Sequence, residues 1–337
     1  MSLSTIKTIL LFSLFLSVCI VLCFGLDLYF YSKKPKNKIH QEKIFTVDHG
    51  QSLAETALKL SDEGLIRTPF KFKMVARIKK SAKKIKAGEF LLSPDMSPND
   101  ILDAFINGRV FLHKVTIPEG YSITQIAAII ENAGLGSSKA FIDAASDKSF
   151  ARSMGIPSDS FEGYLYPETY YFPKGLPEKE MIRTMVNRLR SVITPEWEMR
   201  ARELNMSIHQ ILTLASIIEK ETGTAHERPV ISSVFHNRLK KNMRLESDPT
   251  VIYGISDFNG NITRKDLKTP TPYNTYRIKG LPLGPITNPG HESIEAALYP
   301  DNNDYLYFVS KKDTTHQFST NIKDHNKAVR QYQLRRK

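Results

Sequence analysis

Cysteine is almost absent from this sequence of 337 residues. The two that occur, Cys19 and Cys23, both lie in an apolar stretch near the N-terminus, and none follows them. The rest of the chain therefore forms no disulfide and offers no thiolate nucleophile. A cysteine-free body suits an oxidising compartment, where stray disulfide pairing is a hazard, although composition alone does not identify the compartment.

Motifs for metal and nucleotide chemistry are also missing. The segment His291-Glu-Ser-Ile-Glu295 lacks the second histidine of a zinc-protease helix, and the other histidines are scattered without ligand spacing. No Walker or dinucleotide-binding glycine motif occurs. Ser81-Ala-Lys-Lys84 matches a Ser-x-x-Lys pattern without a Lys-Thr-Gly partner, so chance accounts for the match. The sequence predicts an activity that uses no metal and no cofactor.

The formal net charge of +12 is typical of proteins that bind nucleic acid. The one dense basic cluster has no interleaved aromatic residues to stack on bases. We therefore predict no nucleic-acid partner and interpret the cluster as a solvated face. An alternative is an extracytoplasmic surface that meets anionic phospholipid or wall polymer. The cluster consists of Lys79, Lys80, Lys83, Lys84 and Lys86.

An uncharged apolar stretch of 18 residues runs from Ile9 to Leu26 and is closed by Asp27. This length suffices to span a bilayer, with the aromatic residues at 29–31 near the interface. A cleavable signal peptide is the alternative, but its apolar region is usually shorter and no small-x-small cleavage site follows. We predict residues 1–8 as a cytoplasmic N-terminus, 9–30 as an uncleaved transmembrane anchor and 31–42 as a linker.

A chain of this length is too long for one ordinary core, so two or three compact units are expected. Residues 46–65 align with residues 116–135 at a constant offset of 70. Each copy predicts a short strand, a Gly-x-Ser turn whose serine caps a helix, and a glycine that ends the helix. A strand near 87–94 and a capped helix near 97–108 separate the copies. We assign residues 43–155 to one α+β module.

After Gly155 the pattern changes to longer helical segments joined by loops rich in proline, asparagine and glycine. We assign residues 156–337 to a second, mostly helical domain. Its predicted helices are 178–193, 196–204, 207–222, 226–240 and 321–335, with a strand at 305–310.

The helix at 207–222 carries Glu219 and Glu221 among apolar residues. A carboxyl group in such surroundings keeps its proton near neutrality and can act as a general acid. The two side chains lie about 200° apart around a helix, so they do not form a close pair in one pocket. Both flank the apolar stripe, and periodicity leaves the choice between them open.

Five segments, in this order, resemble the endolytic murein transglycosylase family, the MltG or YceG-like proteins. A sixth, at 161–172, resembles the start of the family's catalytic domain. The five are Leu214-Ala-Ser-Ile-Ile-Glu219-Lys-Glu221-Thr222, Val234-Phe-His-Asn-Arg238-Leu, Met243-Arg-Leu-Glu-Ser-Asp248-Pro-Thr250-Val-Ile-Tyr253-Gly, Tyr273-Asn-Thr-Tyr276 and Gly280-Leu-Pro-Leu-Gly-Pro285-Ile-Thr-Asn288-Pro-Gly290.

The resemblance implies a lysozyme-like domain that cleaves the MurNAc–GlcNAc bond of peptidoglycan glycan strands without water, within nascent strands. One glutamate protonates the leaving oxygen and then, as a carboxylate, takes the proton from the C6 hydroxyl, which closes a 1,6-anhydro ring. The family's catalytic glutamate is the first of Glu-Lys-Glu-Thr, here Glu219, which leaves Glu221 as a supporting residue. A muramidase that uses Asp248 or Glu246 as second carboxylate is one alternative, and a non-catalytic wall-binding scaffold is another.

The resemblance also implies a set of substrate contacts. The amide, hydroxyl and ring faces of Tyr273, Asn274 and Tyr276 suit sugar binding. Asp248 and Thr250 are placed in the same groove, or alternatively in an ordinary turn. Glu162 and Tyr166 are placed on the opposite wall of the cleft.

The first repeat copy, with its Phe45-Thr-Val-x-x-Gly50-x-Ser52-Leu53 pattern, resembles a LysM-type module. That resemblance implies binding to glycan that contains N-acetylglucosamine, and the alternative is a small domain that positions the catalytic part. The predicted fold is therefore α+β. It combines an N-terminal transmembrane helix, a two-copy LysM-like α+β module and a mostly helical lysozyme-like lytic transglycosylase domain.

The family resemblance further implies a single-pass protein of the cell inner membrane with a periplasmic catalytic domain. Its implied partners are glycan strands and membrane-bound peptidoglycan synthases, the penicillin-binding proteins. The charges around the anchor disagree, because four lysines at 33–38 follow it and only Lys7 precedes it. The positive-inside rule would place the large domain in the cytoplasm. We follow the resemblance on this point.

Overall fold

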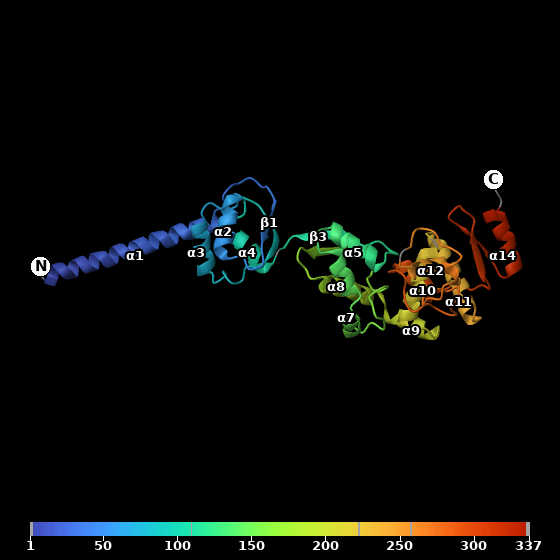
Figure 1. Cartoon of the computed structure of the whole chain (residues 1–337). Helices are drawn as coiled ribbons and strands as arrows, with labels where there is room; N and C mark the ends of the chain where they lie inside the picture. The colour runs from blue at the N-terminus through green and yellow to red at the C-terminus, as the bar shows by residue number, and fades with distance from the viewer. Residues whose placement is uncertain (1–2, 109, 222, 257, 335–337) are drawn as a thin grey trace. The chain divides into compact units, whose positions relative to one another are not determined.

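The computed structural model describes residues 3–108, 110–221, 223–256 and 258–334 (Figure 1). The chain forms two compact units, one of residues 1–113 with 173–175 and one of residues 114–172 with 176–337. The predicted boundary between residues 155 and 156 therefore falls inside the second unit. The second repeat copy belongs to that unit because its apolar residues, among them Ile117, Ile123 and Ile126, are buried in the same core as the helical part.

The first unit is built around a small antiparallel sheet and three helices. Phe45 of one strand lies opposite Phe90 of the other, and both rings are fully buried beside Phe105. Its elements are α1 (Leu3–Lys33), β1 (Lys43–Val47), α2 (Leu53–Asp62), α3 (Pro69–Ile78), β2 (Gly88–Leu92) and α4 (Pro98–Asn107).

Helix α1 has two parts with different surroundings. Residues 5–26 are exposed with few exceptions, and the span Thr5–Lys33 is long and apolar enough to cross a membrane. The last turns instead join the fold of the first unit: Leu28 is buried in its core, and the Tyr31 hydroxyl donates to the Thr68 carbonyl at 2.9 Å. The predicted linker thus begins after Lys33 rather than at residue 31.

The local structure predicted for the repeat is present in both copies. Ser52 begins α2 and Ser122 begins α5 (Ile123–Asn132), and each serine forms a capping box with the residue three positions on. The glycines two positions before these serines, Gly50 and Gly120, have φ values of 79° and 72°, a conformation that other residues rarely adopt.

The second unit is mostly helical. Its elements are β3 (Leu112–Thr116, which begins in the first unit), α5, α6 (Ser138–Ala145), α7 (Lys148–Ser153), β4 (Thr169–Pro173), α8 (Glu178–Val192), α9 (Pro195–Glu203), α10 (Ile208–Glu221), a 3₁₀ turn (Ala225–Glu227), α11 (Arg228–Lys240), α12 (Asp248–Tyr253), a 3₁₀ turn (Asp266–Lys268), α13 (His291–Leu298), β5 (Tyr307–Ser310), β6 (His316–Ser319) and α14 (Ile322–Val329), which continues as a π-helical turn (Arg330–Leu334). Strand β3 pairs with β4, and β5 pairs with β6.

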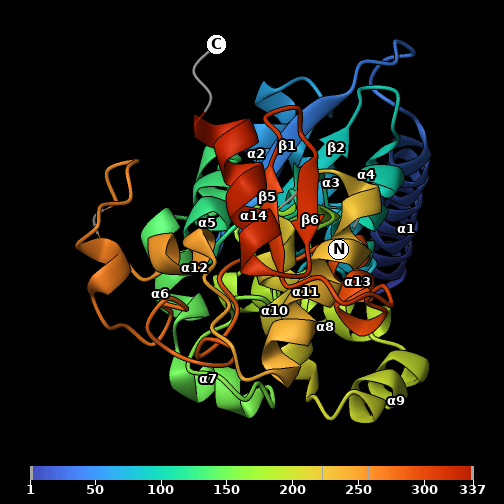
Figure 2. The ribbon, with the colours of Figure 1, turned by 90° about the vertical axis from the view of Figure 1, so that its right-hand side faces the viewer.

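Helix α10 is the centre of this unit and packs against α11 and α13 (Figure 2). Every residue from Ile211 to Ile218 is buried, because neighbouring segments cover the helix on all sides. This enclosure ends only in the last turn, where Glu219 and Glu221 are partly buried. Helix α10 thus runs through the core and places two carboxyl groups at the edge of it.

The segments 161–166 and 280–290 meet closely at Gly163. This glycine has a φ of 84°, and a Cβ atom added there would lie 2.3 Å from Pro285. The absence of a side chain therefore lets the two segments touch, and both lead into the site described below.

We expect Gly163→Ala to lower the free energy of unfolding by about 3 kcal/mol or more, because it adds a clash to the backbone strain. Gly134→Ala is the matched control in the same unit: it has a φ of 67° and no atom within 4 Å of the added Cβ. The control should lose about 1–2 kcal/mol from strain alone. Denaturant unfolding followed by the single tryptophan, Trp197, measures both. Equal losses would show that the contact with Pro285 yields at no cost.

Candidate active site

Glu219 lies in the last turn of α10, and its side chain is only 8% exposed. Its Oε2 accepts a hydrogen bond from the Gly290 backbone N–H at 2.9 Å, and its Oε1 lies 3.8 Å from Arg228 Nη2. Gly290 is the N-cap residue of α13, so the positive end of that helix also faces the carboxyl group. Three positive or hydrogen-bond-donating groups thus surround this carboxyl group.

A second carboxyl group, Glu119, lies beside it. A Cβ added at Gly290 would fall 2.0 Å from the Glu119 carboxyl carbon, and one added at Gly120 would fall 3.2 Å from Glu219 Cγ. Both glycines are therefore needed for the close approach. Burial raises the pKa of Glu119, the charge of Glu219 raises it further, and Arg228 opposes the rise. The two carboxyl groups compete for the same positive surroundings.

Arg228, the first residue of α11, connects this pair to a third carboxylate. Its Nη1 forms an ion pair with Glu292, in the first turn of α13, while its Nη2 faces Glu219. The Arg228 side chain is 10% exposed, and its Nε is buried without a hydrogen-bond partner among the described residues. The cluster of Glu119, Glu219, Arg228 and Glu292 thus holds three carboxyl groups around one guanidinium. We call it the carboxyl cluster.

The side chain of Asn288 holds the cluster together. This residue is fully buried, and its Nδ2 donates to the Tyr121 carbonyl at 2.8 Å and to Glu162 Oε1 at 3.0 Å. Its Oδ1 accepts from the Leu165 N–H at 2.8 Å. The Asn288 backbone also pairs with Tyr121 as a β-bridge. These bonds bring the Glu119 turn to the start of α13 and so to Glu219.

Glu221 faces a different set of residues, as the helical spacing predicted. It accepts a hydrogen bond from the Ser247 hydroxyl. Burial raises its pKa to about 7, the Ser247 bond opposes this, and the charge of Asp248 adds to the rise. The Tyr276 hydroxyl donates to Asp248 Oδ1 at 2.7 Å. A cavity of about 280 Å³ is lined by Glu221, Arg238, Leu245, Glu246, Asp248, Tyr276, Tyr307, Phe308, Ile322 and His325.

Two predicted substrate contacts are placed in the interior instead. Asn274 is buried, its Nδ2 lies within hydrogen-bond distance of three carbonyls at 266, 267 and 269, and its Oδ1 accepts from the Tyr276 N–H. Thr250 is fully buried, and its hydroxyl bonds to the Ser247 carbonyl and the Thr275 hydroxyl. Both side chains thus hold the 247–276 segment in shape, and their contact with a sugar stays a prediction.

Glu162 is also interior rather than on an open wall. It is 5% exposed and accepts hydrogen bonds from the Ile123 N–H at 3.1 Å and the Tyr253 hydroxyl at 3.3 Å, besides that from Asn288. Burial raises its pKa to about 8, against the effect of these donors. Tyr273 is half-buried and packs edge-on against Tyr253 at 4.7 Å. Glu162 therefore stabilises the start of α5, because it accepts a hydrogen bond from the N–H of Ile123, the first residue of that helix.

Tyr166 lies close enough to Glu119 for that carboxyl group's charge to help raise its pKa, after burial. Sequence reasoning missed Glu119, Arg228 and Glu292. The only available signal was the second repeat copy, in which Pro118-Glu119-Gly120 stands where the first copy has Asp48-His49-Gly50. Thr222, at the end of the Glu-Lys-Glu-Thr segment, lies outside the described residues.

Comparison with known proteins gives a consistent result. The model of the YceG-like family matches residues 45–331. A Bacillus subtilis protein named endolytic murein transglycosylase is 34% identical over 325 residues, which cover 90% of this chain and 89% of that protein. A protein of the same name from Streptococcus pneumoniae is 27% identical over 85% of this chain, which spans 57% of that relative's length. A crystal structure of a YceG-like protein from Listeria monocytogenes has a TM-score of 0.59 at 35% identity and covers 86% of this chain and 100% of that chain.

We expect the buried Glu162 to make stability depend on pH. Its pKa of about 8 exceeds the ordinary value of 4.5 for a glutamate, so the folded state binds the extra proton between these values. The contribution of Glu162 to the free energy of unfolding should therefore be fully present below about pH 4.5 and fall by up to about 1.4 kcal/mol per pH unit toward pH 8. Glu162→Gln keeps an acceptor and should remove this slope. Denaturant unfolding of both proteins at several pH values measures it, and parallel curves would contradict the assignment.

Proposed function

Because the chain belongs to the YceG-like family, we propose that it is an endolytic murein transglycosylase that cleaves the MurNAc–GlcNAc bond of peptidoglycan glycan strands. The observation that carries the proposal is the Glu219 carboxyl group, enclosed at the end of a buried helix between a backbone donor, a guanidinium and a second carboxyl group. The name of the Bacillus subtilis relative supports the same activity.

The reaction requires one carboxyl group to be stable in two protonation states. It donates a proton to the glycosidic oxygen and later accepts one, so neither state can be too strongly favoured. Glu219 is enclosed at the end of α10, its Oε2 accepts from the Gly290 N–H, and Arg228 and Glu119 lie beside it. A backbone donor, a guanidinium and a second carboxyl group around one enclosed carboxyl group suit Glu219 to a general acid that becomes a general base.

The proposed steps balance without water. The proton of Glu219 passes to the bridging oxygen as the bond from C1 to that oxygen breaks, which leaves an oxocarbenium-like ring. The C6 hydroxyl of the same MurNAc attacks C1, and its proton returns to Glu219. The products are a free GlcNAc hydroxyl and a 1,6-anhydro-MurNAc end, and the enzyme regains its starting state. Glu119, whose pKa is raised by burial and by the neighbouring Glu219, lies beside the carboxyl group that transfers the proton.

Hydrolysis of the same bond is the second candidate, and one observation favours it. Glu221, with a pKa of about 7, shares its cavity with the carboxyl groups of Asp248 and Glu246. Two carboxyl groups in one cavity, one of them with a raised pKa, are the groups that a muramidase uses. In the transglycosylase reading, Asp248 and Tyr276 instead bind sugar hydroxyls at this cavity, and Glu221 supports them.

The anchor and the first unit suggest where the reaction takes place. Leu28 is buried in the core of the first unit, which supports an uncleaved helix. The order β1–α2–α3–β2, with antiparallel strands, supports a LysM-like module that binds N-acetylglucosamine. We infer a single-pass protein of the cell membrane with both units on the extracytoplasmic, periplasmic side. There it acts beside the penicillin-binding synthases that make its substrate.

Glu219→Gln should reduce cleavage about 100- to 10,000-fold without unfolding the protein, since the amide keeps the shape but has no proton to donate. The measurement is mass spectrometry of the products from isolated glycan strands. Wild-type products should carry no added water, whereas hydrolysis adds one. A wild-type rate in Glu219→Gln would exclude its role.

Glu221→Gln is the matched control two residues away, and we expect a milder loss. The reverse pattern, with full loss at Glu221 and a normal rate at Glu219, would exchange the two roles. If, in addition, the wild-type protein releases products with one added water, the muramidase candidate replaces the transglycosylase.

Glu119→Gln should shift the pH dependence rather than abolish the reaction. The Glu119 carboxyl group has a raised pKa and lies beside Glu219, so its replacement by an amide removes a titrating group from the site and should change the shape of the pH–rate profile. The rate of strand cleavage between pH 4 and pH 9 measures this, with Glu295→Gln, on the same helix α13, as the control. An unchanged profile would show that Glu119 has only a structural role.

A further inference from the structure

The positive charge of this protein is concentrated in two short segments. The chain has 47 basic and 35 acidic residues. Thirteen of the basic residues lie within residues 33–38 and 67–86, and neither segment contains an acidic residue. Without them the chain would be almost neutral. The net charge is therefore a property of one region of the first unit and not of the whole surface.

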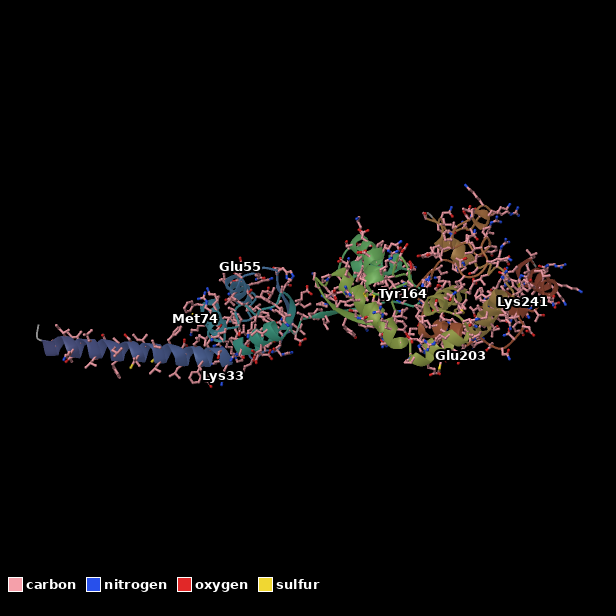
Figure 3. The ribbon with its side chains drawn as sticks, turned by 90° about the horizontal axis from the view of Figure 1, so that it is seen from below. Lys33, Glu55, Met74, Tyr164, Glu203 and Lys241 are labelled. Carbon is pink, nitrogen blue, oxygen red and sulfur yellow. The ribbon has the colours of Figure 1, made fainter. Side chains whose placement is uncertain are left out.

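Both segments lie where the membrane helix joins the first unit. Asp27, which closes the apolar stretch, forms a 2.7 Å ion pair with Lys71 of α3. A cavity of about 270 Å³ is lined from α1 by Gly25, Leu28 and Tyr29, and from α3 and its C-cap by Val75, Ile78 and Lys79, among others. Figure 3 shows Met74 and Lys33 at the end of the first unit from which α1 extends. Helix α3 is thus held level with the end of the apolar span.

The outer face of α3 is unusual for a helix in water. Phe72, Val75 and Ala76 point into the core. Phe70, Met74 and Ile78 follow each other at four-residue intervals and so form one stripe, of which Phe70 and Ile78 are exposed whereas Met74 is partly buried and packs against the core. Phe70 is 56% exposed and Ile78 is 66% exposed. The residues beside the stripe are cations: Lys71, Lys73, Arg77 and Lys79.

An exposed apolar stripe flanked by lysine and arginine is typical of a helix that lies in the membrane interface. We propose that α3 and the loop at 79–86, together the basic platform, seat the first unit on anionic phospholipid headgroups. Phe70 and Ile78 enter the interfacial region, and the exposed lysines of the loop contact lipid phosphates. The anchor supplies the proximity, because it keeps the platform within about one Debye length of the surface.

A wall polymer is the other anionic surface available outside a cell. It explains the lysines but gives no role to Phe70 and Ile78, whose apolar side chains gain little from a hydrated polymer. A wall polymer also does not account for the position of the platform at the level where the apolar span ends. Phospholipid accounts for charge, apolar stripe and position together.

The test uses the full chain in lipid nanodiscs. Ile78→Trp and Phe70→Trp add a fluorophore to the stripe, and the native Trp197, 7% exposed in the second unit, supplies the baseline. Ile44→Trp is the control, because Ile44 is 48% exposed but lies on β1, at the end of the first unit away from α1 (Figure 1). With brominated anionic lipid, we expect at least about threefold stronger quenching at positions 70 and 78 than at position 44.

A second arm tests the charges. Replacement of Lys79, Lys80, Lys83 and Lys84 by glutamine in Ile78→Trp should at least halve the quenching, as should neutral lipid or high salt. The same replacement at Lys240, Lys241, Lys323 and Lys327, exposed lysines of the second unit, should leave it unchanged. Equal quenching at positions 44 and 78, or no dependence on lipid charge, would overturn the proposal. Loss of quenching on addition of soluble poly(glycerol phosphate) to anionic nanodiscs would assign the platform to wall polymer instead. No outcome depends on glycan cleavage.

Discussion

The carboxyl cluster depends on one buried amide, the side chain of Asn288. Its donors and acceptor join three segments that are far apart in the chain: the Tyr121 turn, the Glu162–Leu165 segment and the loop that leads into α13. A buried amide with fixed partners is costly to displace, because each polar atom would lose a bond that water cannot replace. The backbone of Asn288 adds to this junction, because its carbonyl accepts from the Gly120 N–H at 2.9 Å and its N–H donates to the Tyr121 carbonyl at 3.0 Å. The position of Glu119 beside Glu219 therefore depends on a residue that is not itself a member of the carboxyl cluster.

Local features of the sequence predicted local structure well. The serine caps and positive-φ glycines of the repeat are present in both copies because they satisfy backbone groups within a few residues. Helix α10 and the separation of Glu219 from Glu221 followed from helical geometry in the same way. The repeat did not predict which core each copy joins. Caps and glycines encode a turn and a helix, whereas burial of Ile117, Ile123 and Ile126 depends on partners in the rest of the chain.

The same limit applies to the candidate site. Asn274 and Thr250 have the chemistry of sugar ligands, but a loop of irregular backbone needs donors and acceptors of its own, and these side chains supply them. Glu119, Arg228 and Glu292 could not be grouped from sequence because they come from a turn and two helices, and Glu292 is 64 residues from Arg228. Only the fold places one guanidinium between their carboxyl groups.

Two glycines allow the close approach of Glu119 and Glu219, because a side chain at either position would occupy the space of one of these residues. Two carboxyl groups repel each other, and they stay adjacent only if surrounding positive groups are close enough to offset that repulsion. Gly290 allows both to reach the start of α13, since any Cβ there would occupy the space of Glu119. Gly120 allows Glu219 to approach the turn that carries Glu119. The cluster is thus a balance: two backbone positions without side chains bring the carboxyl groups together, and one helix end and one arginine stabilise them there.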